Sequence, residues 1–465
     1  MPQDIQATNA DWAWAPFEPS ADVPWNRLAA AHLCRRAGFG ATTEELDELL
    51  KRSPSEVVHS FVQNATDAAK VDPEGDPLAR AMLAKGNPRS LSAWWLHRML
   101  NSPWLGKGAS TASPLLEKLT LFWHGHFATG ADKVEDAEMM FQQNRLLRRN
   151  ATNSFSSMVQ EISRDPAMLI YLDSATNRKA HPNENYAREI MELFCLGEGN
   201  YSERDIQELA RCFTGWEVRR KKFRFNRYQH DTGTKTILGE TGAFGGEDGI
   251  DIVLRQKACP RFIVGKLVRF FAFDEPAVPE HLLDPLAELF RQSDLQIAPV
   301  VERILASNLF FSRWSVGRKV RSPIELGIGL LRCLKGSSNL DLVAQGLDET
   351  GQAVFYPPNV KGWDGGRTWI NTSTLLGRSN LVGEVLQHEK TRFGGTNLES
   401  FANTNRVGSP EQLVEWLAEL FFATPPDNQI KTELVDSFQR SSSDSSRRIA
   451  ELIHTMSTIP QFHLA

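Results

Sequence analysis

Apolar residues recur at helical spacing along most of the chain. Trp25, Leu28, Ala29, His32 and Leu33 share one face of a helix, because they follow the spacing i, i+3, i+4, i+7. The same periodicity, with capping residues or proline at its starts and glycine after several of its ends, predicts many further helices. These cover residues 44–51, 54–61, 90–100, 114–125, 135–149, 154–164, 183–196, 202–213, 259–271, 279–293, 297–307, 323–334, 340–347, 372–386, 410–422, 429–437 and 446–457.

The period changes between residues 217 and 249. Phe223 and Phe225 alternate there with Arg224 and Asn226, which is the spacing of a β-strand. We therefore expect a mainly α protein, a multi-helix globular chain with a small β-hairpin insertion around 217–249. Three parts are predicted along the chain: an extended N-terminal segment (1–24), a main helical domain (25–388) that contains the insertion, and a C-terminal helical segment (389–465) that packs on the main domain.

The composition argues against two classes of protein, those that bind nucleic acid and those held together by disulfides. The chain has 465 residues, with 52 Lys and Arg against 57 Asp and Glu, and the resulting charge of -5 does not indicate a nucleic-acid partner. The basic run at 219–222 contacts phosphates or is the solvated face of a strand, and the second interpretation is favoured. Five scattered cysteines predict free thiols rather than a disulfide scaffold.

Localisation follows from what the sequence lacks. Residues 1–22 have neither a basic start nor a continuous apolar run, so they do not form a secretory signal. No stretch approaches the roughly 20 apolar residues of a membrane span. As written, the sequence predicts a cytoplasmic protein without a membrane span, unless a signal has been removed from it.

Two histidines flank a glycine where a helix is predicted to end. In Phe122-Trp123-His124-Gly125-His126-Phe127, the imidazoles converge on a ligand only if the chain turns at Gly125, because positions two apart on a helix face different sides. The alternative is a helix C-cap, in which both histidines meet the last carbonyls. The sequence leaves both interpretations open.

A polar stripe follows in the predicted helix after His181. Asn185, Glu189 and Glu192 lie along one side, and Glu184 and Arg188 form a second pair at i, i+4 spacing. Carboxylates at these spacings are typical of shared metal binding or of paired acid and base roles, and an arginine can orient an anion. The alternative is an ion pair on a solvated face. A buried network is the favoured interpretation.

Two loops add candidate residues. His230 and Asp231, with Lys235 after them, provide a metal ligand with its partner or an oriented base, although the segment also has ordinary turn chemistry. The loop 355–366 contains Asn359 and Trp363, and its rings form a stacking wall for a flat ligand or fasten loops over a core.

These segments together resemble the bacterial family known as domain of unknown function 1800. The resemblance extends over nearly the whole chain and is carried by the motifs at 31–40, 123–127, 183–197, 210–216, 230–239, 318–323, 357–360, 369–372 and 459–462. It implies no catalytic residues, because the activity of the family is not established. It implies a sulfatase-like companion, which is often encoded beside family members, and it implies export for many of them.

Three functional hypotheses remain. The leading one is a metal-dependent hydrolase or transferase with a divalent ion. The second is a non-catalytic binding or assembly protein whose aromatic loop docks a glycan or the sulfatase-like companion. The third is a cysteine enzyme, which burial of the thiols disfavours. The leading hypothesis assigns metal ligation to His124, His126, Glu189, His230 and Asp231, catalysis to Glu184, Arg188 and Glu192, and substrate contacts to Asn183, Asn185, Lys235, Asn359 and Trp363.

Overall fold

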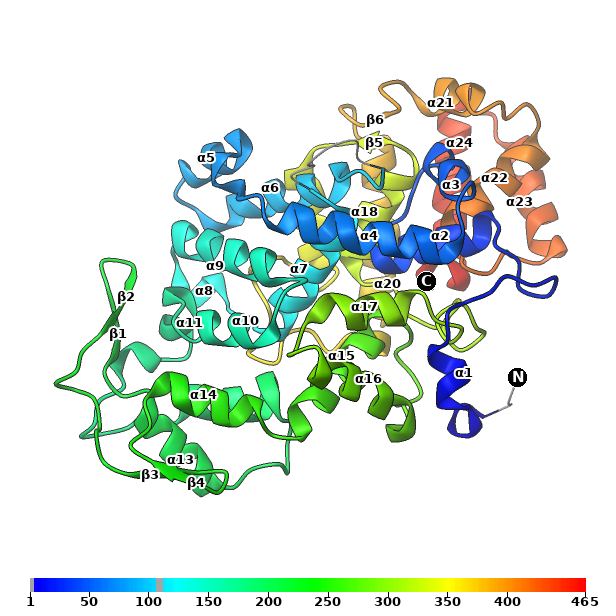
Figure 1. Cartoon of the computed structure of the whole chain (residues 1–465). Coiled ribbons are helices and arrows are strands. Elements are labelled where there is room, and N and C mark those ends of the chain that lie inside the picture. The colour runs from blue at the N-terminus through cyan, green and yellow to red at the C-terminus, as the bar shows by residue number, and fades with distance from the viewer. Residues whose placement is uncertain (1–3, 106–111) are drawn as a thin grey trace.

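The computed structural model describes residues 4–105 and 112–465. In these ranges the chain forms 24 α-helices, and its strands form three antiparallel sheets of two strands each (Figure 1). The mainly α fold predicted from the helical periodicity is therefore confirmed. Across the described ranges, no helix combines the length and apolar character that crossing a bilayer requires.

The helices follow one another with short connections. The first are α1 (Ala10–Trp14), α2 (Arg27–Ala37), α3 (Thr43–Leu49), α4 (Pro54–Ala69), α5 (Pro77–Leu83), α6 (Pro88–Asn101), α7 (Pro114–His126), α8 (Ala131–Val134), α9 (Ala137–Asn150), α10 (Phe155–Ile162), α11 (Pro166–Tyr171), α12 (Asn185–Glu189) and α13 (Glu203–Cys212). The others are α14 (Gly246–Leu254), α15 (Ala258–Phe271), α16 (Glu280–Gln292), α17 (Ile297–Leu305), α18 (Pro323–Cys333), α19 (Leu340–Glu349), α20 (Thr372–Gln387), α21 (Leu398–Thr404), α22 (Pro410–Phe421), α23 (Asn428–Arg440) and α24 (Ser445–Ser457).

Short elements complete the chain. The 3-10 helices are η1 (Ile5–Ala7), η2 (Pro73–Gly75), η3 (Ser174–Thr176), η5 (Gly366–Trp369) and η6 (Pro460–His463), and η4 (Ile190–Cys195) is a π-helix. The strands are β1 (Trp216–Arg219), β2 (Lys222–Phe225), β3 (Lys235–Ile237), β4 (Glu240–Gly242), β5 (Gly336–Ser337) and β6 (Arg392–Phe393).

Side-chain caps explain where many of these helices begin. Ser53, Ser202 and Ser322 each accept a hydrogen bond from the backbone three residues later and form a capping box with an acidic residue there. The same chemistry corrects the expectation for residues 1–24. These residues are not wholly extended, because Asp4 caps η1 and Asn9 caps α1.

The insertion contains two hairpins rather than the one predicted. β1 pairs with β2 and β3 pairs with β4, both antiparallel, and the β1–β2 ribbon projects from the body of the molecule (Figure 1). Each hairpin has two residues with positive φ at its tip, Arg220 with Lys221 and Leu238 with Gly239. Such tight turns make each strand pair with its neighbour in sequence. The end of the predicted insertion is helical, because α14 begins at Gly246.

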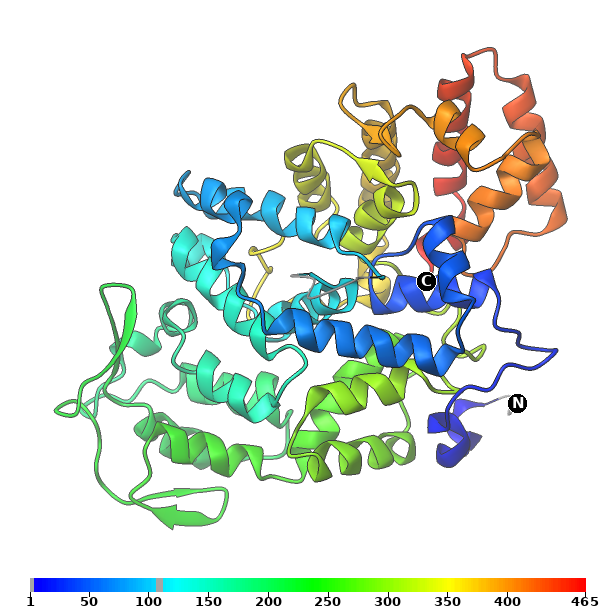
Figure 2. The same cartoon turned by 45° about the horizontal axis from the view of Figure 1, so that its top comes forward.

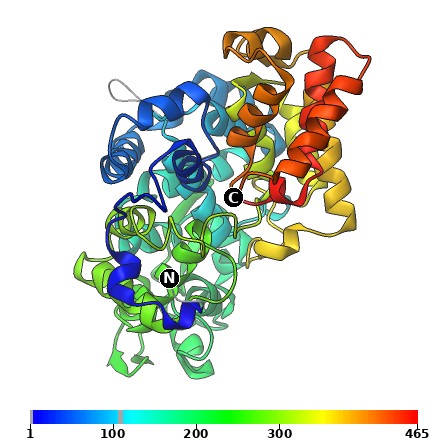
Figure 3. The ribbon, with the colours of Figure 1, turned by 90° about the vertical axis from the view of Figure 1, so that its right-hand side faces the viewer.

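The C-terminal helices lie against the rest of the chain. α22 contacts α2, and α24 contacts α20, which places the orange and red helices beside blue α2 and yellow α20 (Figures 2 and 3). β6 adds a short pairing with β5, through Gly336 and Phe393.

The helix α7 lies at the centre of the fold. Its neighbours include α2, α4, α6 and α9, and nearly all of its side chains are buried. Burial extends to Glu117, whose carboxylate accepts hydrogen bonds from Arg98, Arg148 and the indole of Trp95. Burial has the largest single effect on the pKa of Glu117 and raises it, but the charges and hydrogen bonds of Arg148 and Arg98 together outweigh burial, and the net shift is downward.

Candidate functional site

The two histidines of α7 point in different directions. The helix continues through His126 instead of turning at Gly125, so positions two apart face different sides. The Nε2 atom of His124 accepts a hydrogen bond of 3.0 Å from the backbone N–H of Phe355. His126 instead lies 2.9 Å from the carbonyl oxygen of Phe194 through its own Nε2. The convergence that a turn at Gly125 would give is absent.

These contacts fix the tautomer and charge of each imidazole. Nε2 of His124 accepts a hydrogen bond, so the proton of this ring is on Nδ1, whereas the partner of His126 is a carbonyl oxygen, so Nε2 of His126 carries the proton. Burial lowers the pKa of His124 to about 4. Burial, and then the positive charge of Lys266, lower the pKa of His126 well below its usual value. Both histidines are therefore neutral at pH 7.

The asparagines of the predicted stripe hold backbone rather than face a cavity. Asn183 donates its amide to the carbonyl oxygen of Asp173, and Asn185 donates to that of Leu172. Both contacts fasten the start of α12 to the turn before it. Their assignment to substrate contacts stays a prediction.

The charged residues of the same stripe form separate contacts. Arg188 pairs with Glu184 and with Glu203 at the surface, and Glu192 accepts a hydrogen bond of 3.1 Å from the hydroxyl of Tyr201. Glu189 is half-buried, and its pKa is raised by burial and then by the charge of Glu192. The positive charges of Arg188 and Lys361 oppose this rise in the pKa of Glu189. Lys361 belongs to the loop 355–366, so Glu189 is close enough to this loop to interact with it electrostatically.

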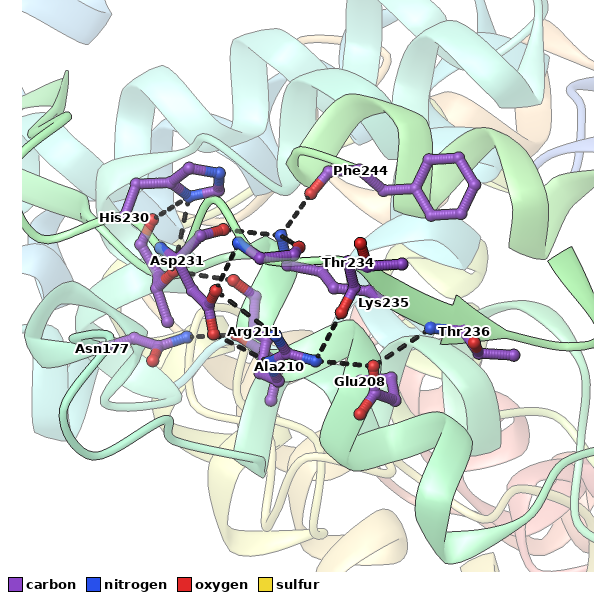
Figure 4. A network of polar contacts seen from close by, with 12 residues as sticks. Asn177, Glu208, Ala210, Arg211, His230, Asp231, Thr234, Lys235, Thr236 and Phe244 are labelled. Carbon is purple, nitrogen blue, oxygen red and sulfur yellow. Dashed lines mark hydrogen bonds and ion pairs between the residues drawn. The ribbon is translucent and has the colours of Figure 1, made fainter. Parts of the chain in front are cut away.

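His230, Asp231 and Lys235, which the sequence suggested as a further group of site residues, form contacts that stabilise the insertion (Figure 4). Asp231 forms an ion pair of 2.7 Å with Arg211, and Nδ1 of His230 lies 2.9 Å from the carbonyl oxygen of Thr214. The buried ammonium of Lys235 donates to three carbonyl oxygens, those of Asp231, Gly233 and Phe244. These bonds tie the loop before β3 to α13.

The predicted metal ligands do not assemble into one site. Among the residues that the structure describes, no three or more His, Cys, Asp or Glu side chains are grouped so that they could hold a metal ion. The divalent ion therefore stays a prediction, which metal analysis tests. The five cysteines are free and buried, as expected for inert thiols.

A cavity of about 250 Å³ lies beside His126. Four of the segments that carry the family resemblance, or that directly follow one, meet there: His126 from α7, Lys319 from the segment before α18, Trp363 from the loop after the two prolines, and Trp369 from η5. A further contribution comes from α15. This convergence makes the cavity the candidate functional site.

Most of the carboxylates at this cavity are already neutralised. Asp274 pairs with Lys319 at 2.7 Å, and Glu325 pairs with the buried Lys118. Burial raises the pKa of Glu325, but the charges of Lys118 and Lys319 outweigh it and lower the pKa to about 2. Glu325 is therefore ionised at neutral pH, both carboxylates have a lysine partner, and Asp364 is the further carboxylate in the lining.

Three cations of the lining differ, because in the described residues they form no ion pair. Lys266 and Arg269 lie one turn apart on α15, and Lys361 lies on the loop. Arg269 donates to the backbone oxygen of Asp364 at 3.1 Å. Three such cations against one carboxylate give the cavity a local excess of positive charge.

The π-helix η4 supplies the acceptors that hold two of these side chains. Leu196 and Gly197 both donate their N–H groups to the carbonyl oxygen of Met191. The carbonyl oxygens of Leu193 and Phe194 instead accept hydrogen bonds from side chains: that of Leu193 from Nζ of Lys266 at 2.8 Å, and that of Phe194 from Nε2 of His126. Irregular helix geometry thus leaves backbone acceptors available for the side chains of the site.

The loop 355–366 fits closely against the end of α7. Gly362 has φ +75, and a Cβ there would lie 2.2 Å from the carbonyl oxygen of Gly125. This approach sets Trp363 beside His124, with ring centroids 5.7 Å apart, and into the cavity lining. Only a residue without a side chain permits the close approach of position 362 to Gly125.

Asn359, on the same loop, does not line this cavity and accepts a hydrogen bond from the N–H of Lys361.

Sequence reasoning missed the contribution of α15. Lys266, Arg269 and Phe270 line the cavity, but in the sequence Lys266 and Arg269 look like the polar positions of an ordinary amphipathic helix. The available signal was indirect: Lys319 and Trp369 lie in segments that carry the family resemblance, yet neither was proposed as a site residue.

Comparisons with known proteins place the chain in a family. No curated protein and no solved structure matches it. A family profile described as "Protein of unknown function (DUF1800)" matches residues 32–464, which is nearly the whole chain. The resemblance noted from the motifs is therefore confirmed, and the chain belongs to the DUF1800 family.

Proposed function

We propose that the chain binds a small organic anion in the cavity beside His126. Its carboxylate or other oxyanion would lie near Lys266, Arg269 and Lys361, and its ring or apolar part would lie against the cavity tryptophans. The observation that carries this proposal is that one lining holds three cations which, among the described residues, have no ionic partner. Lys266 is half-buried, and a partly desolvated cation attracts an anion more strongly than a solvated one, whereas Arg269 and Lys361 are exposed at the mouth of the cavity.

The aromatic walls favour a ligand with a ring. Trp363 is half-buried and Trp369 is 8% exposed, so their faces are accessible from inside the cavity rather than from a flat surface. Such walls contact a small ligand or one sugar unit more readily than a protein. An acidic unit of a glycan belongs to this ligand class. The sulfatase-like companion stays a prediction that co-purification tests, and so does hydrolase or transferase activity.

Titration calorimetry with paired ligands tests this proposal. Phenyllactate and glucuronate carry a carboxylate and a ring, whereas 2-phenylethanol and glucose are their neutral counterparts. We expect the acids to bind and the neutral compounds not to bind. Lys266→Met should weaken binding of the acids about tenfold or more, since a hydrogen bond to a charged group contributes about 1.5–3 kcal/mol.

The control variant is Lys257→Met. Lys257 is exposed at the start of the same helix and does not line the cavity, so its loss should leave affinity unchanged. Trp363→Ala should weaken binding of phenyllactate through lost ring contact. Equal binding of acids and neutral counterparts, or equal affinity in Lys266→Met and Lys257→Met, would contradict the proposal.

A further inference from the structure

We infer that Lys266 is a carbonyl-reactive amine, which forms an imine with an organic anion that carries an aldehyde or keto group and enters the cavity. The substrate class is therefore an oxo acid. This inference rests on the proposed function, because the anion has to occupy the cavity beside His126 before its carbonyl group can meet the amine.

The hydrogen bonds of Lys266 direct its lone pair. Its Nζ atom lies 2.8 Å from the carbonyl oxygen of Leu193 and 3.2 Å from Nδ1 of His126. Both partners are acceptors, because Nε2 of His126 donates to Phe194 and Nδ1 is left without a proton. A neutral amine has two N–H bonds and one lone pair. The two acceptors take both N–H bonds, so the lone pair remains for the cavity that Lys266 lines.

Burial is the main reason why Lys266 loses its proton more readily than an exposed lysine. Burial lowers its pKa, Cys195 opposes this change, and the charge of Arg269 adds to it, so that the pKa is about 8. The facing imidazole of His126 is neutral, and in the described residues no carboxylate pairs with the ammonium. The ring of Phe262, 4.6 Å from Nζ, favours the charged form. With a pKa of about 8, the ammonium form that attracts the anion predominates at pH 7, and about a tenth of the amine is neutral and able to attack a carbonyl group.

Other buried lysines in the chain lack this combination. Lys118 pairs with Glu325, and Lys319 pairs with Asp274. Lys235 gives all three of its N–H groups to carbonyl oxygens. Lys118 and Lys319 thus each have a carboxylate partner and Lys235 has an acceptor for every N–H group, whereas Lys266 has neither in the part of the chain that the structure describes.

The reaction balances without an oxidant or reductant. The lone pair of Nζ forms a bond to the carbonyl carbon, and the carbonyl π electrons move to oxygen, which takes up a proton. The resulting carbinolamine loses its hydroxyl group with a proton as water, and the nitrogen loses its two hydrogens overall. A carboxylate held near Arg269 and Lys361 would orient the adjacent carbonyl group toward Lys266.

Borohydride trapping followed by peptide mass spectrometry tests the inference. The intact chain is incubated at pH 7 with phenylpyruvate, reduced with sodium borohydride, and mapped for alkylated lysines. We expect Lys266 to be trapped faster than exposed lysines such as Lys257 by on the order of a hundredfold, which follows from the difference in neutral fraction. Phenyllactate has the same ring and carboxylate but a hydroxyl in place of the keto group, so an excess of it should protect Lys266.

Variants separate reactivity from binding and folding. Lys266→Arg keeps the positive charge and removes the nucleophile, so it should bind phenyllactate and yield no trapped adduct at this position. Circular dichroism and thermal melting check that it folds. Binding of phenyllactate by the wild type without preferential trapping of Lys266 would overturn the inference and leave the proposed function standing. Absence of phenyllactate binding would overturn both.

Discussion

His124 is a buried neutral histidine, and its titration should make the protein less stable as the pH falls. Its side chain is 2% exposed, and burial lowers its pKa to about 4 from an ordinary value of 6.5. Between these two values the unfolded chain binds a proton that the folded chain does not bind. Stability from this group is therefore complete above about pH 6.5 and is lost as the pH falls toward 4.

The size of the effect follows from the shift. Each unit of pKa difference corresponds to about 1.4 kcal/mol, so lowering the pH from 8 to 5 should cost about 2 kcal/mol through His124 alone. Near pH 5.5, unfolding should take up about 0.9 proton at this position. Other buried histidines add to the total, so the wild type must be compared with a variant that lacks only this imidazole.

The variant is His124→Gln, whose amide oxygen can still accept the N–H of Phe355. The free energy of unfolding of both proteins is measured by denaturant titration at pH 8 and pH 5. The wild type should lose about 2 kcal/mol more than the variant over this interval. Calorimetry in buffers of different ionisation enthalpy gives the proton uptake independently. Equal pH dependence in the two proteins would refute a neutral buried His124.

Three further changes test other parts of the account. Glu117→Ala leaves two buried arginines without their shared carboxylate, and we expect a loss of about 3–5 kcal/mol in chemical denaturation; a loss below 1 kcal/mol would contradict it. Gly362→Ala should destabilise the protein more than Gly395→Ala in thermal melting, because both glycines have positive φ but only the first meets a backbone oxygen, that of Gly125; equal effects would argue against the close approach. Metal analysis of protein purified without chelator should find less than one divalent ion per chain, because Nε2 of His124 already accepts a hydrogen bond. Stoichiometric metal that is lost in a folded His124→Ala variant would instead support the divalent-ion hypothesis.

Local rules predicted most of the helices but left the histidine pair undecided. Caps such as Ser53 and Ser322 act within one turn, so their effect is visible in the sequence. A glycine near a helix end either stops the helix or lies inside its last turn. At Gly125 the helix continues to His126, because tertiary contacts to Phe194 and Phe355 hold both imidazoles. Those partners lie far along the chain and leave no local signal.

The cavity could not be predicted for the same reason. Lys266 and His126 are separated by 140 residues. They are brought together by the packing of α15 against η4 and by the contact of Phe270 on α15 with Phe122 on α7. Polar positions on an amphipathic helix look the same whether they face solvent or a cavity. The family motifs did identify segments that meet there, including the loop of Trp363, but they did not indicate which side chains face inward.

The most direct test of the central claim is the position of a bound aryl carboxylate. Crystals soaked with 4-bromophenyllactate would show the bromine by its anomalous signal. We predict a bromine peak between Trp363 and Trp369, with the carboxylate near Lys266 and Arg269, and a clearly weaker peak in Lys266→Met crystals soaked at the same concentration. A peak at another place on the protein, or an unchanged peak in Lys266→Met crystals, would contradict this prediction.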